Sequence, residues 1–275
     1  MTPIDRQTIL ITGATDGLGR AMAAQLAAQG ATLVLHGRSK DKGEALVEEL
    51  RAKTGNDRIS YLLADFARLS DIHRLADEAG ALDRLDVLVN NAGIGVELDR
   101  QESWDGHELT FQVDYLAAYV LAVRLAPLLV RSAPARIVNV TSVGQAPVNF
   151  DDVMLRRRWD GVQAYCQAKL AQVMLTVDLA AALEGTGVTV NALHPASYMP
   201  TKMVVGLFTP QSTVAEGVRH TLRLVADPSL DGVTGRYFNR SAEARASSQA
   251  YDSAARARLR SISEELTGVP FPYAA

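Results

Sequence analysis

Thr12-Gly13-Ala14-Thr15-Asp16-Gly17-Leu18-Gly19 joins a short β-branched run at residues 8–11 to a helical pattern that starts at Leu18. A strand, a glycine-rich turn and a helix in this order indicate a βα unit. The three glycines let the chain turn sharply, bring the backbone close to a ligand and pack the helix on the strand. The free N–H groups at the start of the helix can bind a pyrophosphate, and a tight turn without a ligand is the alternative.

The rest of the chain repeats this alternation. Apolar runs such as Val87-Leu88-Val89 are nearly continuous, which is typical of strands buried on both faces of a parallel sheet. The pattern predicts strands at residues 8–12, 32–36, 58–64, 85–90, 135–141, 187–193 and 233–238, and helices at residues 18–29, 40–53, 70–81, 101–130, 162–183 and 213–226. We therefore expect an α/β fold with one doubly wound, Rossmann-type parallel sheet of about seven strands and helices on both faces. The C-terminal run 242–266 is expected to be a helical surface segment.

Composition limits the class of protein. The 275 residues are 48% hydrophobic and 21% charged, which suits one large core, and no linker marks a boundary, so we predict a single domain over 1–275. A net charge of −3 gives no electrostatic case for nucleic acid or an anionic membrane. We expect no membrane span, because no apolar run approaches about 18 residues. The N-terminus lacks a signal-peptide layout, which predicts a cytoplasmic location. One cysteine and five scattered histidines predict no disulfide framework and no metal site.

The end of the second predicted strand carries Arg38, Ser39 and Lys40. In a dinucleotide-binding fold this position lies beside the adenosine ribose, where an acidic side chain would bind a free 2′-hydroxyl. A guanidinium fits the 2′-phosphate of NADP(H) instead, so we favour NADP(H), with NAD(H) possible. An exposed surface arginine is the alternative, and the Asp16 carboxylate works against a second phosphate.

Two further strand ends carry polar side chains. Asp65 and Phe66 follow the third strand, and Asn90-Asn91-Ala92-Gly93 follows the fourth. Ligands of open α/β sheets bind at the carboxyl ends of the strands. Asp65 could accept a hydrogen bond from an adenine amino group, or it could be a turn or capping aspartate.

The chemistry is expected in Tyr165-Cys166-Gln167-Ala168-Lys169, near the start of a helix after the fifth strand. A spacing of four places the phenol and the ammonium on one helix face, where the lysine charge should lower the tyrosine pKa. Thr141 and Ser142 end the strand before it, and a hydroxyl there could hold a substrate oxygen. A Tyr–Lys pair on a solvated helix face is the alternative, which the order of the preceding motifs disfavours.

In this order the motifs resemble the classical short-chain dehydrogenase/reductase family. The residues that carry the resemblance are the turn at 12–19, the Asn-Asn-Ala-Gly motif, Ser142, and Tyr165 with Lys169. The resemblance implies that Tyr165 is the general acid/base, that Lys169 binds the nicotinamide ribose and lowers the tyrosine pKa, and that Ser142 orients the substrate oxygen. It also implies a homodimer or homotetramer. Residues 234–238 and 250–266, and the long stretch between Ser142 and Tyr165, are similar to the retinol-dehydrogenase-like branch.

The resemblance further implies a cofactor site. Its residues are Gly13, Thr15, Asp16, Gly17, Leu18, Gly19, Arg38, Ser39, Asp65, Phe66, Asn91, Ala92, Gly93, Thr141, Tyr165, Lys169, Pro195 and Ala196. The chain departs from the family in two places that bear on the site. Asp114 stands where the family usually has an asparagine of the proton relay, and we count it as a catalytic residue. Ala196 follows Pro195 where the family commonly has glycine, which could reshape the loop against the nicotinamide.

The sequence predicts a substrate side formed by an insertion at residues 143–161 and a loop at 198–210. Both follow strand ends, and their apolar side chains favour a lipophilic substrate. The residues expected to line it are Val143, Val148, Phe150, Tyr198, Met199, Met203, Val204, Leu207 and Phe208. The expected function is NADP(H)-dependent hydride transfer to or from a carbonyl or secondary alcohol of a small molecule. The alternative is a non-redox dinucleotide-binding regulator or scaffold with a relay altered at Asp114.

Overall fold

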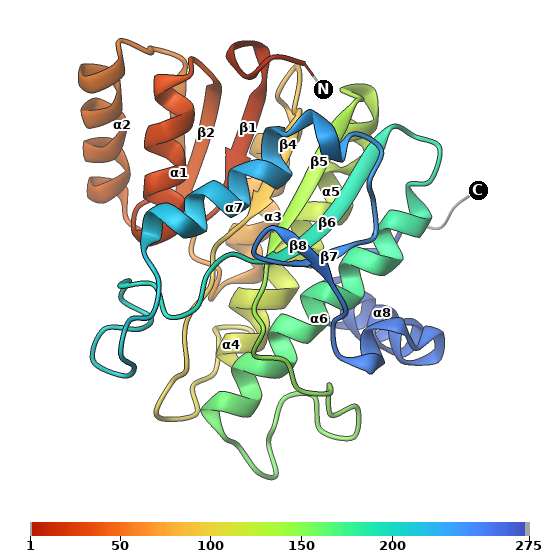
Figure 1. Ribbon diagram of the computed structural model, residues 1–275. Coiled ribbons are helices and arrows are strands. Elements are labelled where there is room, and N and C mark those ends of the chain that lie inside the picture. Colours follow the sequence, from red (N-terminus) through yellow and green to blue (C-terminus); the bar gives the residue numbers. More distant parts are fainter. Residues whose placement is uncertain (1, 273–275) are drawn as a thin grey trace.

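The structure, a computed structural model, describes residues 2–272. Eight strands form one sheet in the order β3-β2-β1-β4-β5-β6-β7-β8 (Figure 1). They are β1 (Thr8–Ile11), β2 (Thr32–Gly37), β3 (Ile59–Leu63), β4 (Val87–Asn90), β5 (Ala135–Val140), β6 (Val188–His194), β7 (Tyr237–Asn239) and β8 (Ala242–Ala244). The neighbouring strands from β3 to β7 pair in parallel, and β8 is antiparallel to β7. The predicted doubly wound α/β fold is confirmed, with β8 as an additional strand.

The sheet reverses its winding direction between β1 and β4. From β1 the chain adds β2 and β3 on one side, and it then crosses to add β4 to β7 on the other. Ligands of such sheets bind at the carboxyl ends of the strands at this switch point. The glycine turn follows β1 and the Asn-Asn-Ala-Gly motif follows β4, so both lie at the switch point.

Helices cover both faces of the sheet (Figure 1). They are α1 (Gly17–Ala28), α2 (Lys40–Thr54), α3 (Leu69–Gly80), α4 (Leu109–Phe111), the π-helical turn η2 (Gln112–Leu116), α5 (Ala117–Arg131), α6 (Gly161–Ala182), α7 (Val214–Ala226) and α8 (Ser253–Thr267). Short 3₁₀ turns are η1 (Ile4–Arg6), η3 (Pro228–Leu230) and η4 (Ser248–Tyr251).

Alternate side chains of the strands enter two separate cores. Leu10 of β1 and Leu88 of β4 pack with α3, α5 and α6, whereas Ile9 and Ile11 of β1 pack with α1 and α2. All four side chains are fully buried. This burial on both faces explains why the strands read as continuous apolar runs in the sequence.

The C-terminal part of the chain differs from the predicted single helical segment. Residues 242–244 form β8, and α8 begins only at Ser253, where the Asp252 side chain caps its first N–H groups. The helix then lies against α6 and η2, and the residues that follow it contact α5. The Tyr115 hydroxyl is 2.7 Å from Ser263 Oγ, and the Tyr119 hydroxyl donates to the Val269 carbonyl at 2.9 Å.

The helix predicted over 101–130 begins later, at Leu109. The preceding residues form a β-bridge between Glu102 and Glu108 around a turn at Gly106, whose φ is +77°. Glu108 then caps the helix, because its carboxylate accepts a hydrogen bond from the Phe111 N–H at 2.7 Å. The capping residue therefore sets the start of the helix, and the sequence-based boundary was wrong.

One helical stretch bears on the expectation that the chain has no membrane span. Among the described residues one helical stretch, Leu109–Arg131, is long and apolar enough by length and composition. In this structure 78% of its most apolar window is buried inside the fold, as in the core helix of many proteins. One such helix is weak support for a span.

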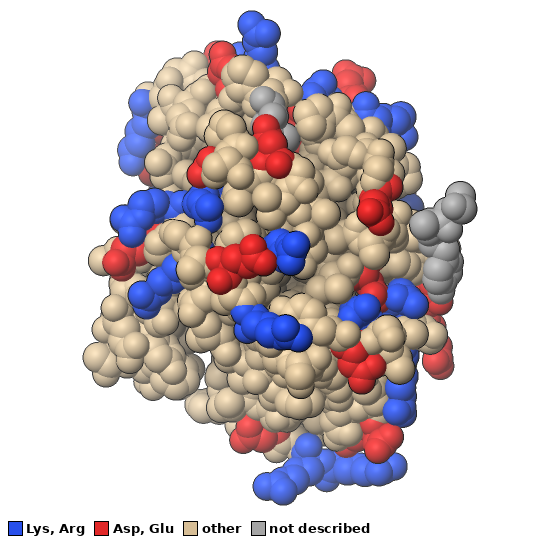
Figure 2. Space-filling model, turned by 45° about the vertical axis from the view of Figure 1, so that its right-hand side comes forward, with Lys and Arg blue, Asp and Glu red and all other residues tan. Residues whose placement is uncertain are grey.

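Charge is interspersed over one face of the molecule. Figure 2 shows Lys and Arg side chains mixed with Asp and Glu side chains on a largely uncharged face. This mixture agrees with the small formal net charge of −3.

Candidate active site

The glycine turn is a tight cradle between β1 and β4. Gly13 has a φ of +66°, and a Cβ at this position would lie 2.8 Å from Ala92 Cα. A Cβ on Gly19 would collide with the Gly13 carbonyl and would lie 2.6 Å from Asn91 Nδ2. Both positions therefore require glycine, because any side chain would push the turn away from the end of β4.

Thr12 fastens the Asn-Asn-Ala-Gly motif to this turn. Its hydroxyl accepts hydrogen bonds from the backbone N–H groups of Asn91 and Ala92, each at 2.9 Å. The Asn91 side chain returns the contact by donating to the Thr12 carbonyl at 2.8 Å. Asn91 and Ala92 thus lie at the predicted cofactor site, where their contacts within the chain hold the cradle in shape.

Asp16 caps the first turn of α1 and contacts the loop 198–210. Its carboxylate accepts from the Gly17 N–H at 2.8 Å and forms an ion pair with Lys202. The hydrogen bond from Lys202, the largest of several effects, lowers the pKa of Asp16. The Asp16 carboxylate, whose charge was expected to oppose the 2′-phosphate of NADP(H), is therefore partly neutralised by Lys202. The sequence analysis did not single out this lysine.

The end of β2 presents a free cation. Arg38 is exposed, and its guanidinium makes no hydrogen bond or ion pair with residues 2–272. Ser39 caps α2 by accepting from the Lys42 N–H at 3.5 Å. A Cβ on Gly37 would lie 2.9 Å from Thr15 Cγ2, so Thr15 of the glycine turn packs beside this strand end.

His36 is a site residue that the sequence analysis missed. Its Nε2 is 3.1 Å from the Ala64 carbonyl and therefore carries the proton, and its Nδ1 accepts from the Gly13 N–H at 3.3 Å. Burial lowers the pKa of His36 to about 4, so the ring is neutral at pH 7. His36 thereby ties β2 to the glycine turn and to the end of β3. A histidine in an otherwise apolar strand was the available signal.

The two predicted cofactor residues at the end of β3, Asp65 and Phe66, have different surroundings. The Phe66 ring is buried and stacks on His36, with the ring centroids 4.3 Å apart. Its side chain belongs to the core, so only its backbone can face a nucleotide. Asp65 Oδ1 accepts from the Ala67 N–H at 3.1 Å, which is the turn interpretation that the sequence left open.

The predicted catalytic residues come together beside this cradle. Ser142 lies just beyond β5, and Tyr165 and Lys169 lie in the first turns of α6. Lys169 Nζ is 5.6 Å from the centroid of the Tyr165 ring and 3.0 Å from Asp114 Oδ2. A Cβ on Gly144 would lie 3.4 Å from Ser142 Oγ and 3.7 Å from the Tyr165 ring, so the two side chains share one small space.

Asp114 is held by the backbone after β4. Its Oδ1 accepts from the Ile94 N–H at 2.7 Å, and its side chain is fully buried. It lies in the π-helical turn η2, a widened turn that often occurs at functional sites. A Cβ on Gly93 would lie 3.0 Å from the Asp114 carboxylate and 3.2 Å from Lys169 Nζ, so glycine is needed there for the pair to approach the strand end.

The titration of the tyrosine is set by burial more than by the lysine. Burial raises the pKa of Tyr165 above its ordinary value, while the Lys169 charge and the Ser142 hydroxyl lower it and the Asp114 carboxylate raises it. The expected net lowering of the tyrosine pKa was therefore wrong. At neutral pH the phenol is protonated and can donate its proton.

Lys169 remains charged although it is buried. Burial acts to lower the pKa of its ammonium, but the Asp114 carboxylate and Tyr165 outweigh this effect, and the pKa is raised. Burial raises the pKa of Asp114, against the opposing charge of Lys169. Gln172, which the sequence analysis missed, places Oε1 3.4 Å from the same ammonium. Its position one turn after Lys169 on the same helix was the available signal.

The segment after β6 lies beside the other strand ends of the site. Pro195 and Ala196 are buried, and the Pro195 carbonyl accepts from His220 Nδ1 at 2.7 Å. The Thr141 hydroxyl donates to the Leu193 carbonyl at 3.0 Å, which joins the ends of β5 and β6. These contacts place the two predicted cofactor-facing strand ends side by side.

Comparison with known proteins identifies the family. The family model described as short chain dehydrogenase matches residues 7–212. The chain is 34% identical to human retinol dehydrogenase 14 over 96% of its own length and 87% of that protein. It is 32% identical to mouse retinol dehydrogenase 13, over 98% and 86% of the two chains. The chain is a short-chain dehydrogenase/reductase. It belongs to the retinol-dehydrogenase-like branch and is an NAD(P)-dependent oxidoreductase.

Solved structures agree with this assignment. A structure from Mycobacterium paratuberculosis superimposes with a TM-score of 0.81 and 29% identity, and covers 97% of this chain and 95% of the other. A short chain dehydrogenase from Escherichia coli CFT073, complexed with NADPH, gives a TM-score of 0.68 and 27% identity over 86% of this chain and 96% of the other. Dinucleotide binding by this short-chain dehydrogenase/reductase follows from the family.

The two segments of the predicted substrate side differ in character in this short-chain dehydrogenase/reductase. The loop 198–210 is largely exposed, and the rings of Tyr198 and Phe208 stack with centroids 4.9 Å apart. In the insertion, Val148 is buried in the core and Phe150 packs against that core. Val143, at the start of the insertion, is half exposed.

Proposed function

We propose that this chain catalyses the NADP(H)-dependent reduction of a carbonyl group on a lipophilic small molecule, with Tyr165 as the general acid. The observation that carries the proposal is the position of the Tyr165 phenol beside Ser142 and the buried Lys169–Asp114 pair. A raised tyrosine pKa suits an acid that must donate a proton to a carbonyl oxygen.

The cradle fits the cofactor that the family implies. The side-chain-free surface at Gly13 and Gly19 allows a pyrophosphate to approach the N–H groups at the start of α1. The Arg38 guanidinium, which has no partner among residues 2–272, is available for a 2′-phosphate, and Lys169 would hold the nicotinamide ribose. When bound, the nicotinamide supplies a hydride to the carbonyl carbon.

The residues of the chain manage the proton and the orientation. Ser142 would donate a hydrogen bond that fixes the carbonyl oxygen next to the Tyr165 hydroxyl. Tyr165 then gives its proton to that oxygen, and the alcohol product leaves. Lys169 stabilises the resulting phenolate through its charge, and Asp114 holds the ammonium in place at 3.0 Å.

Three observations support a lipophilic substrate. The relatives named retinol dehydrogenases act on an apolar alcohol by their name. The loop 198–210 exposes Val205, Leu207 and Phe208. Val143 adds an exposed apolar side chain next to Ser142. We infer that these side chains border the entrance for the substrate.

A substrate panel tests the proposal. Purified protein is mixed with NADPH or NADH and with aldehydes and ketones of increasing chain length, and cofactor oxidation is followed by absorbance. We expect oxidation of NADPH, faster than of NADH, with long apolar aldehydes preferred. A protein that binds NADPH but oxidises it with no panel member, or that prefers small charged substrates, would contradict the proposal.

Arg38→Asp should separate the two cofactors. The substitution removes the partner of the 2′-phosphate and adds a repelling charge, so the Kd for NADPH should rise about 10- to 100-fold while that for NADH changes little. Arg131→Asp, an equal charge change at the far end of α5, is the control. Fluorescence titration measures both constants. Equal losses for the two cofactors would show that Arg38 has only a structural role.

Asp114→Asn should change the pH dependence of turnover. The Asp114 carboxylate raises the pKa of Tyr165, so its removal lowers that pKa. Reduction needs the protonated phenol, and activity is lost as pH rises through the tyrosine pKa. The alkaline limb of the rate profile should therefore move to lower pH, with little loss of maximum rate because the amide keeps the shape. An inactive variant would assign the carboxylate a catalytic role of its own, and an unchanged profile would show that Asp114 does not act on Tyr165.

A further inference from the structure

The residues after β8, 245–272, form a C-terminal segment. This segment runs beside the insertion 143–161, which follows Ser142. Gln249, in η4, meets the insertion at a single residue. Its Oε1 accepts from the Val148 N–H at 2.7 Å, and its Nε2 donates to the Val148 carbonyl at 3.2 Å. One amide side chain thus satisfies both backbone groups of Val148, as a neighbouring strand would do.

A second contact links the same segment to Ser142. Gln145 Nε2 donates to the Ser142 carbonyl at 2.8 Å, and Gln145 Oε1 accepts from the Ser247 N–H at 2.8 Å. The Tyr237 hydroxyl donates to the Ser142 carbonyl as well, at 3.1 Å. The position of the Ser142 backbone therefore depends on Tyr237 of β7 and, through Gln145, on Ser247 of the C-terminal segment.

The insertion is also tied to α6, the helix that carries Tyr165. Gln167 Nε2 donates to the Val153 carbonyl at 2.8 Å, and its Oε1 accepts from the Asn149 N–H at 3.3 Å. On the outer side, Arg258 of α8 donates to the Phe150 carbonyl at 3.0 Å. Residues 148–153 are consequently held between the catalytic helix and the C-terminal segment.

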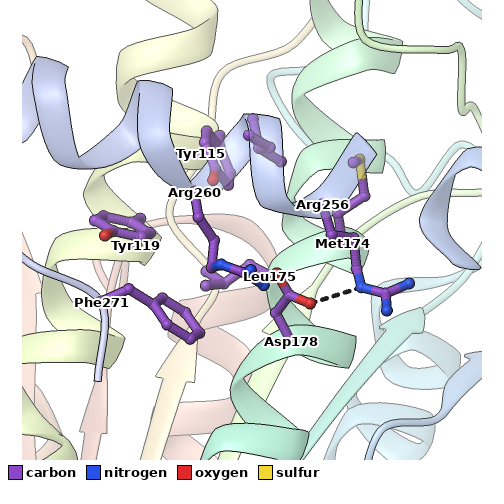
Figure 3. A pocket seen from close by; sticks show the side chains of 9 residues that line it. Tyr115, Tyr119, Met174, Leu175, Asp178, Arg256, Arg260 and Phe271 are labelled. Carbon is purple, nitrogen blue, oxygen red and sulfur yellow. Dashed lines mark hydrogen bonds and ion pairs between the residues drawn. The ribbon is translucent and has the colours of Figure 1, made fainter. Parts of the chain in front are cut away.

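The C-terminal segment is itself firmly anchored. Asp178 of α6 lies between Arg256 and Arg260 of α8, with an ion pair of 2.6 Å to each (Figure 3). Arg256 Nη1 additionally donates to the Ala250 carbonyl at 3.0 Å, directly next to Gln249. Contacts therefore connect Asp178 of α6, through Arg256 and Ala250, to Gln249, the residue that contacts Val148.

We propose that Gln249 is a positioning residue that sets substrate selectivity by fixing the insertion 143–161 against the active site. The insertion begins directly after Ser142 and ends where α6, the helix of Tyr165, begins, so its conformation shapes the wall next to the reacting carbonyl. A fixed wall selects substrates by shape, and a loosened wall accepts more shapes with weaker binding. This inference rests on the proposed function.

The test compares Gln249→Ala with wild type by two measurements. Hydrogen exchange read by mass spectrometry reports on the Val148 N–H without any turnover, and peptides covering residues 145–153 should exchange faster while those covering residues 8–20 should not change. Steady-state kinetics with NADPH and straight-chain aldehydes from butanal to decanal should show KM about tenfold higher for the preferred chain length, with kcat and the Kd for NADPH nearly unchanged.

Two further variants sharpen the comparison. Gln249→Glu keeps the acceptor for the Val148 N–H but loses the donor to its carbonyl, so exchange should be intermediate. Gln25→Ala removes an equal side chain from the exposed face of α1 and should match wild type in both measurements.

The outcomes separate the two claims. Unchanged exchange at 145–153 in Gln249→Ala would show that the contact does not hold the insertion, and faster exchange with unchanged KM and chain-length preference would show that it does not set selectivity. Either result overturns the inference. A wild-type protein that reduces none of the aldehydes contradicts the proposed function, whereas the exchange comparison still decides whether Gln249 holds the insertion.

Discussion

Tyr165→Phe is expected to lower kcat for carbonyl reduction by about 10²- to 10⁴-fold, the usual contribution of a general acid. The substitution deletes the phenolic proton and leaves the ring in place beside Ser142 and Lys169. Because the glycine cradle and Arg38 are untouched, the Kd for NADPH should stay close to that of wild type. Kinetics at saturating cofactor, with a fluorescence titration of NADPH, make the measurement.

Tyr119→Phe is the matched control for this prediction. It removes another buried phenolic hydroxyl, which donates to the Val269 carbonyl on the far side of α5. We expect its turnover to remain at the wild-type level. A Tyr165→Phe variant with the wild-type kcat would show that another group moves the proton.

Asp178→Ala should destabilise the fold by about 3 kcal/mol. Asp178 is buried, and its removal leaves two partly buried guanidinium groups, those of Arg256 and Arg260, without their carboxylate. The midpoint of thermal unfolding should fall by roughly 6–10 °C. Calorimetry or circular dichroism measures the change.

Asp77→Ala provides the comparison for this stability effect. Asp77 forms an ion pair with Arg124 at 2.5 Å, but its side chain is 65% exposed. Exposed pairs contribute about 0–1 kcal/mol, so little change is expected. Equal destabilisation by the two substitutions would contradict the view that α8 is anchored through a buried charge.

Much of the fold follows from local patterns. The strands from β1 to β6 were predicted to within a few residues, because each is a short run bounded by polar turns and, except for the edge strand β3, is apolar and largely buried. The helix predicted from 101 failed at its start because the apolar periodicity does not reveal the bridge between Glu102 and Glu108. The prediction of a helix over residues 242–266 failed for a related reason. β8 has three residues, and its pairing with β7 depends on the neighbouring strand rather than on its own sequence.

The site was predictable where motifs carry it. Ser142, Tyr165 and Lys169 come together as the sequence indicated, and Asp114 lies next to Lys169. The sign of the tyrosine pKa shift was not predictable, because burial is a property of the packed structure and outweighs the lysine charge.

The sequence analysis missed the roles of residues that act through distant partners. Thr12 and His36 hold the glycine turn through contacts with β3 and β4, and Gln249 meets Val148 across the substrate side. The spacing of residues along the sequence does not predict such contacts. They become visible only when the strand ends and the C-terminal segment are placed in space.

Transfer of deuterium from cofactor to product tests the central claim most directly. The wild-type protein is incubated with decanal and NADPH labelled with deuterium at C4, using both stereochemical forms of the label in separate reactions. We predict that one form gives decanol carrying deuterium on its carbinol carbon and the other gives unlabelled decanol. Unlabelled decanol from both forms, or no decanol, would contradict the proposal that this chain is an NADP(H)-dependent carbonyl reductase.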